Sequence, residues 1–220
     1  MDHKRIFIEN ALESNALKFG QFTLKSGRIS PYFFNMGLFS SGKVMSALGT
    51  AYAETILNSG IEFDVLFGPA YKGIPMAAVT VAKLAELGKE EKWNRIEYAF
   101  NRKEKKDHGE GGNIVGPSLE GKRILIIDDV ITAGTAINEA YEIIVQAKGI
   151  VTGIVIAVDR QETTADSTQS AVQAVSKRYN VPVVSIVGLS DLVEFAKEKL
   201  SQEQLDAIVE YKKTYGARVE

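Results

Sequence analysis

The chain from residue 63 onward alternates short apolar segments with segments of helical periodicity. The apolar segments lie at residues 63–67, 98–100, 123–127, 151–158 and 181–187. The segments of helical periodicity lie between them, at residues 74–87, 135–148 and 167–179. Strands that alternate with helices form parallel β-α-β units with helices on both faces of the sheet. Because Ile124–Ile127 is a run of branched apolar residues, its strand is expected to be buried on both faces. The pattern predicts an α/β fold with a parallel central sheet flanked by helices.

The first sixty residues have a different pattern. We expect a helix through Leu17, followed by a small β-rich flap over residues 19–34, in which Ser26-Gly27 and Ser30-Pro31 supply turns. A second helix then ends at Gly60. This part is predicted to form a small α+β hood on the main sheet.

The tail of the chain is predicted to be helical. Ser201 is followed three residues later by Gln204, which is the spacing of a capping box, and apolar residues recur at helical spacing up to Tyr215. We therefore expect a single domain over residues 1–220. Its parts are an N-terminal helix and hood at 1–60, a core at 61–190 and C-terminal helices at 191–220.

Composition excludes several classes of function. The 26 basic and 28 acidic side chains give a net charge of −2, which offers no bulk attraction to nucleic acid or to an acidic membrane. There is no cysteine for a disulfide or a thiolate metal site, and two histidines alone do not complete a zinc site. No segment approaches the roughly 20 apolar residues of a membrane span, and the N-terminus lacks the pattern of a signal peptide. We expect a soluble, cytoplasmic protein.

The segment from Ile124 to Ala136 carries the clearest chemical signal. A buried strand delivers two adjacent carboxylates, Asp128 and Asp129, to its C-terminal end, and a loop of small and hydroxyl residues leads into a helix. Ligands of open parallel sheets bind outside the carboxyl ends of the strands. The backbone N–H groups of such a loop can surround a phosphate at the helix N-terminus. The carboxylates would repel that phosphate, so they are expected to face ribose hydroxyls.

A purely structural role for this segment is the alternative. Asp128-Asp129 would then end a strand, and Thr132 or Thr135 would cap the next helix. Capping needs one polar group, whereas this segment combines two carboxylates with a glycine-containing hydroxyl loop. The segment lacks the Gly-Lys-Ser/Thr ending of a P-loop, and the G-x-G-x-x-G pattern of dinucleotide folds is absent as well.

Residues 101–112 form a second unusual segment. They contain four cations, three anions, His108 and three glycines within four residues. Such runs are usually solvated loops. Here the glycines suggest hinges, and a loop that closes over a ligand excludes water from the reaction. Closed over a pyrophosphate, the cations would offset the charge of the leaving group.

These segments resemble a known family. Asp128 to Ala136 is similar to the signature of type I phosphoribosyltransferases that binds phosphoribosyl pyrophosphate (PRPP), and residues 101–112 resemble the catalytic loop of the orotate phosphoribosyltransferases. Three further segments match that family in order: 24–35 its flap, 67–75 its pyrophosphate loop and 158–162 the segment with its base-reading arginine. The resemblance implies a type I phosphoribosyltransferase fold and transfer of a phosphoribosyl group from PRPP to orotate, for pyrimidine (UMP) biosynthesis.

The resemblance also implies roles for individual residues. Catalytic roles fall to Lys103, Lys106, His108, Asp128 and Asp129. PRPP would be bound by these five together with Lys25, Tyr71, Lys72, Arg102, Val130, Ile131, Thr132, Ala133, Gly134, Thr135 and Ala136. Orotate would be bound by Lys25, Phe33, Phe34, Thr132 and Arg160, with Arg160 pairing with the substrate's carboxylate.

Cofactor and partners follow from the same resemblance. Mg²⁺ is expected, carried mainly by PRPP, so no dedicated protein ligands are predicted. Residues 103–118 are expected to form a mobile catalytic loop that reaches the active site of the other subunit in a homodimer. A phosphoribosyltransferase for another base remains an alternative, and a non-catalytic PRPP-sensing regulator is a weaker one because no DNA-binding element precedes the domain.

Overall fold

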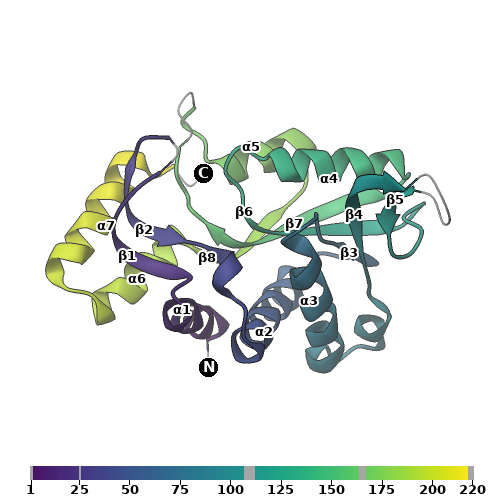
Figure 1. Ribbon diagram of the computed structural model, residues 1–220, viewed down its shortest axis with the longest axis horizontal. Coiled ribbons are helices and arrows are strands. Elements are labelled where there is room, and N and C mark those ends of the chain that lie inside the picture. The colour runs from purple at the N-terminus through teal and green to yellow at the C-terminus, as the bar shows by residue number, and fades with distance from the viewer. Residues whose placement is uncertain (1, 25, 107–111, 164–166, 218–220) are drawn as a thin grey trace.

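A six-stranded sheet runs through the middle of the molecule, with the strand order β5-β4-β3-β6-β7-β8 (Figure 1). The computed structural model describes residues 2–24, 26–106, 112–163 and 167–217. The strands of this sheet are β3 (Val65–Phe67), β4 (Glu97–Lys106), β5 (Gly112–Val115), β6 (Arg123–Val130), β7 (Ile150–Asp159) and β8 (Val183–Gly188). All neighbouring pairs are parallel except β4 and β5. The predicted parallel central sheet flanked by helices is confirmed, with one antiparallel strand added at its edge.

Helices cover both faces of this sheet (Figure 1). On one face lie α4 (Thr135–Gln146) and α5 (Ala171–Tyr179); on the other lie α2 (Gly42–Ser59) and α3 (Gly73–Leu87). The predicted run on β6 packs into both layers, because side chains alternate along a strand. Ile124 and Ile126 join the core beneath α4, Leu125 and Ile127 join the core beneath α2, and all four are fully buried.

The N-terminal hood is a two-stranded antiparallel sheet of β1 (Leu17–Thr23) and β2 (Ile29–Phe34), followed by the short helix η1 (Met36–Leu38). The helix α1 (His3–Glu13) precedes it. The predicted helix through Leu17 was wrong in its end point, because Leu17 opens β1. Asn15 has φ of +59°, and a residue in this left-handed region stops the helix.

Two C-terminal helices, α6 (Leu189–Lys199) and α7 (Gln202–Tyr215), pack beside the hood (Figure 1). The predicted capping box is present: the Ser201 hydroxyl accepts from the backbone N–H of Gln204, and the Ser201 backbone N–H donates to the Gln204 side chain. The connection before β4 holds a second short helix, η2 (Glu91–Arg95), whose Trp93 is buried against Phe63. Among the described helices, none has both the length and the apolar character needed to cross a membrane.

The segment 103–118, expected to be a loop, contains the end of β4 and the whole of β5. β4 continues to Lys106 and β5 starts at Gly112, so the two strands form a hairpin. Residues 107–111, between the two strands in sequence, lie outside the described residues. The predicted mobility of this segment and its reach into a second subunit stay predictions.

Candidate functional site

The acidic pair lies at the carboxyl end of β6. Asp128 and Asp129 are each only 8% exposed. The pair is held by its own backbone: the N–H of Asp129 donates to the Asp128 carboxylate at 2.9 Å, and the N–H of Val130 donates to the Asp129 carboxylate at 2.8 Å. Burial, followed by the neighbouring charge of Asp129, raises the pKa of Asp128 to about 7. Two carboxylates this close in a shielded position favour a ligand that brings hydroxyl donors or a cation.

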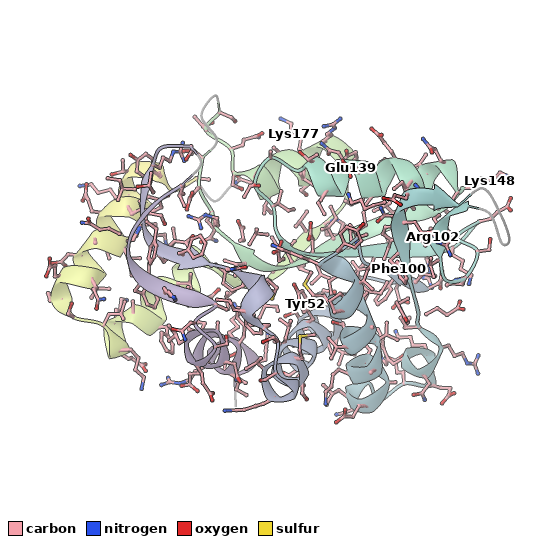
Figure 2. All side chains as sticks on the ribbon, viewed as in Figure 1. Tyr52, Phe100, Arg102, Glu139, Lys148 and Lys177 are labelled. Carbon is pink, nitrogen blue, oxygen red and sulfur yellow. The ribbon has the colours of Figure 1, made fainter. Side chains whose placement is uncertain are left out.

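Tyr52 of α2, labelled in Figure 2, contacts the backbone of this pair. Its side chain is fully buried, and its hydroxyl donates to the backbone carbonyl of Asp128 at 2.8 Å. A buried hydroxyl that lost this acceptor would incur the cost of an unsatisfied polar group, so the bond fixes the end of β6 relative to α2. The sequence motifs assign no role to Tyr52. Its spacing on the helix is that of any core residue.

A tight loop between β3 and α3 brings Lys72 to the acidic pair. The Lys72 ammonium lies 3.1 Å from the Asp129 carboxylate, and Tyr71 beside it is 71% exposed. Gly68 and Gly73 make the loop possible because their backbones touch, and a Cβ on Gly68 would lie 2.1 Å from the Gly73 carbonyl oxygen. The side chain of Asn101 on β4 accepts from the backbone N–H of Ala70 at 2.9 Å.

The loop from Val130 to Gly134 leads into α4, and the N-terminus of that helix has no side-chain cap. Gly134 is the N-cap residue, with φ of +74° and no side chain to accept from the first-turn N–H groups. Thr132, Ala133, Thr135 and Ala136 around it are exposed. The capping role considered for Thr132 and Thr135 is therefore not found among the described contacts. A helix start with free N–H groups suits a phosphate.

Arg160 follows the end of β7, the strand next to β6. Because Val130 pairs with Val158, Arg160 lies just beyond the strand end that neighbours the acidic loop. Its guanidinium is 15% exposed, forms an ion pair with Glu162 at 2.7 Å and donates to the Ser30 hydroxyl of the hood at 3.2 Å. It also lies over the ring of Tyr32, 4.5 Å from its centroid.

The two predicted hood aromatics have different environments. Phe33 is 41% exposed and packs against Phe22 with the two rings tilted and their centroids 5.6 Å apart. Phe34 packs instead with Phe7 and Phe39 of the hood core. Of the two side chains, Phe33 is the more exposed.

The predicted cations are distributed around the β4–β5 hairpin. Arg102 donates to the Gly112 carbonyl at 3.5 Å, and Lys103 pairs with Glu139 of α4 at 3.3 Å; Figure 2 shows Arg102 and Glu139 in the same part of the molecule. Lys25, His108 and the side chain of Lys106 lie outside the described residues. Their predicted roles stay predictions.

The fold therefore brings four features together at the carboxyl ends of neighbouring strands. They are the acidic pair, the Lys72 loop, the uncapped start of α4 and, one strand further along, Arg160 under the hood. Sequence analysis did not identify four supporting residues, which are Tyr52, Asn101, Glu162 and Tyr211. The arrangement provides N–H donors for a phosphate, carboxylates for sugar hydroxyls and a guanidinium for a planar anion. No group of three or more histidine or acidic side chains suited to a metal occurs in the described part of the chain.

Comparison with known proteins agrees with this arrangement. The family model described as phosphoribosyl transferase domain matches residues 40–186, which hold β3, β6, the acidic pair and the start of α4. Fold and site together define the chain as a phosphoribosyltransferase of type I.

More specific likenesses come from whole-chain relatives. The orotate phosphoribosyltransferase of Yarrowia lipolytica is 59% identical over 216 residues, covering 98% of each chain. Orotate phosphoribosyltransferase 2 of Saccharomyces cerevisiae is 59% identical over 218 residues, covering 98% of this chain and 96% of that one. The crystal structure of the Francisella tularensis orotate phosphoribosyltransferase superposes with a TM-score of 0.86 at 43% identity, covering 96% of this chain and 99% of that one. The chain belongs to the orotate phosphoribosyltransferase family.

Proposed function

We propose that this chain transfers the 5-phosphoribosyl group of PRPP to orotate, giving orotidine 5′-monophosphate and pyrophosphate, a step of pyrimidine biosynthesis. In this reaction the bond from ribose carbon 1 to a pyrophosphate oxygen breaks, and a bond to a ring nitrogen of orotate forms as that nitrogen loses its proton. The observation that carries the proposal is the position of Arg160. It is a largely buried cation one strand away from the acidic pair, beneath a hood with an exposed aromatic ring.

PRPP is assigned to the carboxyl edge of β3 and β6. Its 5′-phosphate would lie at the start of α4, within Thr132, Ala133, Gly134, Thr135 and Ala136, with Val130 and Ile131 shaping the entry to the loop. The absence of a side-chain cap on α4 supports this assignment. The ribose hydroxyls would face Asp128 and Asp129, and the pyrophosphate would lie against Tyr71 and Lys72.

Catalysis is proposed to be electrostatic. Positive charge develops on the ribose as pyrophosphate leaves, and a carboxylate about 4 Å away contributes up to about 4 kcal/mol at an effective dielectric near 20. Only the part of this interaction that is stronger in the transition state accelerates the reaction. At the other end Arg102, Lys103, Lys106 and His108 would offset the charge of the departing pyrophosphate. Lys25 of the hood would lie beside both substrates.

Mg²⁺ is the proposed cofactor, and the donor set fits it. The ion prefers oxygen ligands and is commonly held by one or two carboxylates together with substrate phosphates. Asp128 and Asp129 are two carboxylates at the proposed ribose position, and the charge of a divalent cation would offset their mutual repulsion. When bound with PRPP, the ion neutralises charge on the leaving group.

A homodimer with shared active sites is also proposed. The β4–β5 hairpin bears Arg102 and Lys103 at the edge of the sheet, and the glycine-containing segment joins its two strands in sequence. A hairpin at an edge is suited to reach a neighbouring molecule. In this arrangement the cations of one subunit serve the acidic pair of the other.

Formation of orotidine monophosphate tests the function. The chain is mixed with PRPP, orotate and Mg²⁺, and both nucleotide and pyrophosphate are followed. We expect equal amounts of the two products, loss of activity when Mg²⁺ is chelated, and loss of activity with orotate in Arg160→Ala. A chain that releases no pyrophosphate under these conditions contradicts the proposal.

A further inference from the structure

We propose that Glu162 and Tyr211 are positioning residues that hold the Arg160 guanidinium for a carboxylate on the base, so that the C-terminal helix α7 takes part in base recognition. This inference rests on the proposed function. It concerns residues outside the sequence motifs, and it assigns a task to a part of the chain that carries no predicted site residue.

The first observation is the way in which Arg160 is held. The Glu162 carboxylate contacts Nη2 of Arg160 at 2.7 Å, and the Ser30 hydroxyl accepts from the same nitrogen at 3.2 Å. Ser30 is fully buried and donates its own proton to the Tyr32 carbonyl, so its hydroxyl oxygen serves as the acceptor, for Arg160 and, at 3.4 Å, for the Tyr32 N–H. Within the described residues, neither Nε nor Nη1 of Arg160 has a hydrogen-bond or ion-pair partner. Glu162 and Ser30 thus occupy one nitrogen of Arg160 and leave the other two for a ligand.

The second observation is that the plane of the guanidinium is fixed as well. The Tyr32 ring lies under it at 4.5 Å, and the Tyr32 hydroxyl reaches Glu162 at 3.4 Å. Both members of the ion pair are largely buried, at 15% and 12% exposure. Bidentate recognition of a carboxylate depends on this kind of planar orientation, which an unsupported arginine side chain would lose through rotation.

The third observation is the hydroxyl of Tyr211. Tyr211 comes from α7 and is 5% exposed, and its hydroxyl lies within interaction range of both Arg160 and Glu162, although no hydrogen bond of good geometry links it to a described residue. It nevertheless lies close to the charged pair. Burial raises the pKa of Tyr211, the charge of Glu162 adds to the rise, and Arg160 opposes it. A buried hydroxyl next to a carboxylate and a guanidinium calls for a role. We assign Tyr211 the role of fixing the Arg160–Glu162 pair from the side of α7.

The backbone ties α7 to the same place. The segment after β7 pairs with the end of the chain: Thr163 donates its backbone N–H to the Tyr215 carbonyl at 2.8 Å, and Ala217 donates to the Gln161 carbonyl at 2.7 Å. From the hood, Arg28 donates to the Thr163 carbonyl at 2.7 Å and lies over the Tyr215 ring at 4.7 Å. Hood, β7 and α7 therefore meet around Arg160, and movement of α7 would change its orientation.

Glu162 has a second effect on the site, because it neutralises Arg160 before substrate arrives. An incoming carboxylate meets a paired cation, and its own charge is repelled by Glu162. If Glu162 mainly competes with the orotate carboxylate for Arg160, its removal tightens orotate binding. The positioning role predicts the opposite, because the guanidinium without its partner loses its fixed orientation. The two roles are thus separated by the sign of one change.

The experiment compares the Michaelis constants for orotate and for PRPP in the parent, in Glu162→Gln and in Tyr211→Phe. Hydrogen bonds to charged groups correspond to factors of about ten or more in binding. We expect the KM for orotate to rise at least about tenfold in Glu162→Gln and about threefold in Tyr211→Phe, with the KM for PRPP within about twofold of the parent. Glu210→Gln, which removes an exposed charge next to Tyr211, is the matched control and leaves both constants unchanged.

KM values do not depend on the fraction of enzyme that is folded, so a general structural lesion does not imitate the expected split. Should Glu162→Gln fail to fold, Tyr211→Phe still decides, since it removes a single hydroxyl group. An orotate KM that is unchanged or lowered in both variants overturns the inference alone. A parent that forms no orotidine monophosphate overturns the proposed function and this inference with it.

Discussion

The ammonium group of Lys72 lies 3.1 Å from the carboxylate of Asp129. This ion pair joins the tight loop after β3 to the acidic pair at the end of β6, the two places assigned to pyrophosphate and ribose. The side chain of Lys72 is 60% exposed and that of Asp129 only 12%, so the lysine is the partner free to turn toward an incoming phosphate. The pair offsets one of the two carboxylate charges of the site until substrate arrives.

Lys72→Met tests this assignment. We expect the KM for PRPP to rise at least about tenfold, because a charge-assisted contact to pyrophosphate is lost, while the KM for orotate changes little. Steady-state kinetics with each substrate varied in turn measures both. Lys89→Met, at an exposed position distant in sequence from the motif, serves as the control and leaves both constants unchanged. Equal changes in the two constants of Lys72→Met would contradict the assignment.

Asp128 predicts a pH dependence of stability. Its pKa is about 7 in the folded chain, whereas an ordinary aspartate, as in the unfolded chain, has a pKa of 3.8. Between these two values the folded chain keeps a proton that the unfolded chain has lost. The free energy of unfolding therefore falls as pH rises from about 4 to about 7, by at most about 4 kcal/mol from this group. Asp128→Asn removes that contribution. Urea unfolding without substrates should show the variant gaining stability over the parent between pH 5 and pH 8; a difference that is independent of pH would refute this.

Tyr52→Phe removes the hydroxyl that donates to the Asp128 carbonyl at 2.8 Å. Loss of a buried hydrogen bond costs about 1–2 kcal/mol of unfolding free energy, and it loosens the end of β6. We expect that loss in urea unfolding and a higher KM for PRPP. Tyr98→Phe, on a 41% exposed side chain, is the matched control and changes stability by less than about 0.5 kcal/mol. Parent-like stability and kinetics in Tyr52→Phe would remove Tyr52 from the site.

Mixed dimers test the shared active site. Lys106→Ala and Asp129→Asn are each expected to be inactive. After unfolding and refolding together, a mixed dimer holds one site with both changes and one with neither, so up to about a quarter of the parent activity returns. Each variant refolded alone gives the baseline. If the mixture stays at that baseline while dimers form, each subunit uses its own loop.

Much of the fold and part of the site can be predicted from local sequence. Ile124–Ile127 followed by Asp128 and Asp129 defines a buried strand and its polar end without any knowledge of its neighbours. Asn15 shows where local patterns fail, because apolar periodicity continued past a residue whose backbone stops the helix. The β4–β5 hairpin is a second case, since alternating charges looked like a loop although the backbone pairs through Lys106.

The supporting residues could not be predicted from the sequence, for a different reason. Tyr52, Glu162 and Tyr211 act through contacts between distant segments: Tyr52 reaches residue 128, and Tyr211 approaches residues 160 and 162. Each has the sequence surroundings of an ordinary helix face or loop. Only the packing of hood, β7 and α7 brings the last two to Arg160.

The most direct test of the account is product formation from PRPP and Mg²⁺ with orotate, uracil, hypoxanthine and adenine offered separately. If Arg160 recognises the base through the base's carboxylate, nucleotide forms from orotate alone, since the other three bases have no carboxylate. Comparable product from uracil would contradict the role of Arg160. Saturable PRPP binding without product from any base would contradict catalysis itself.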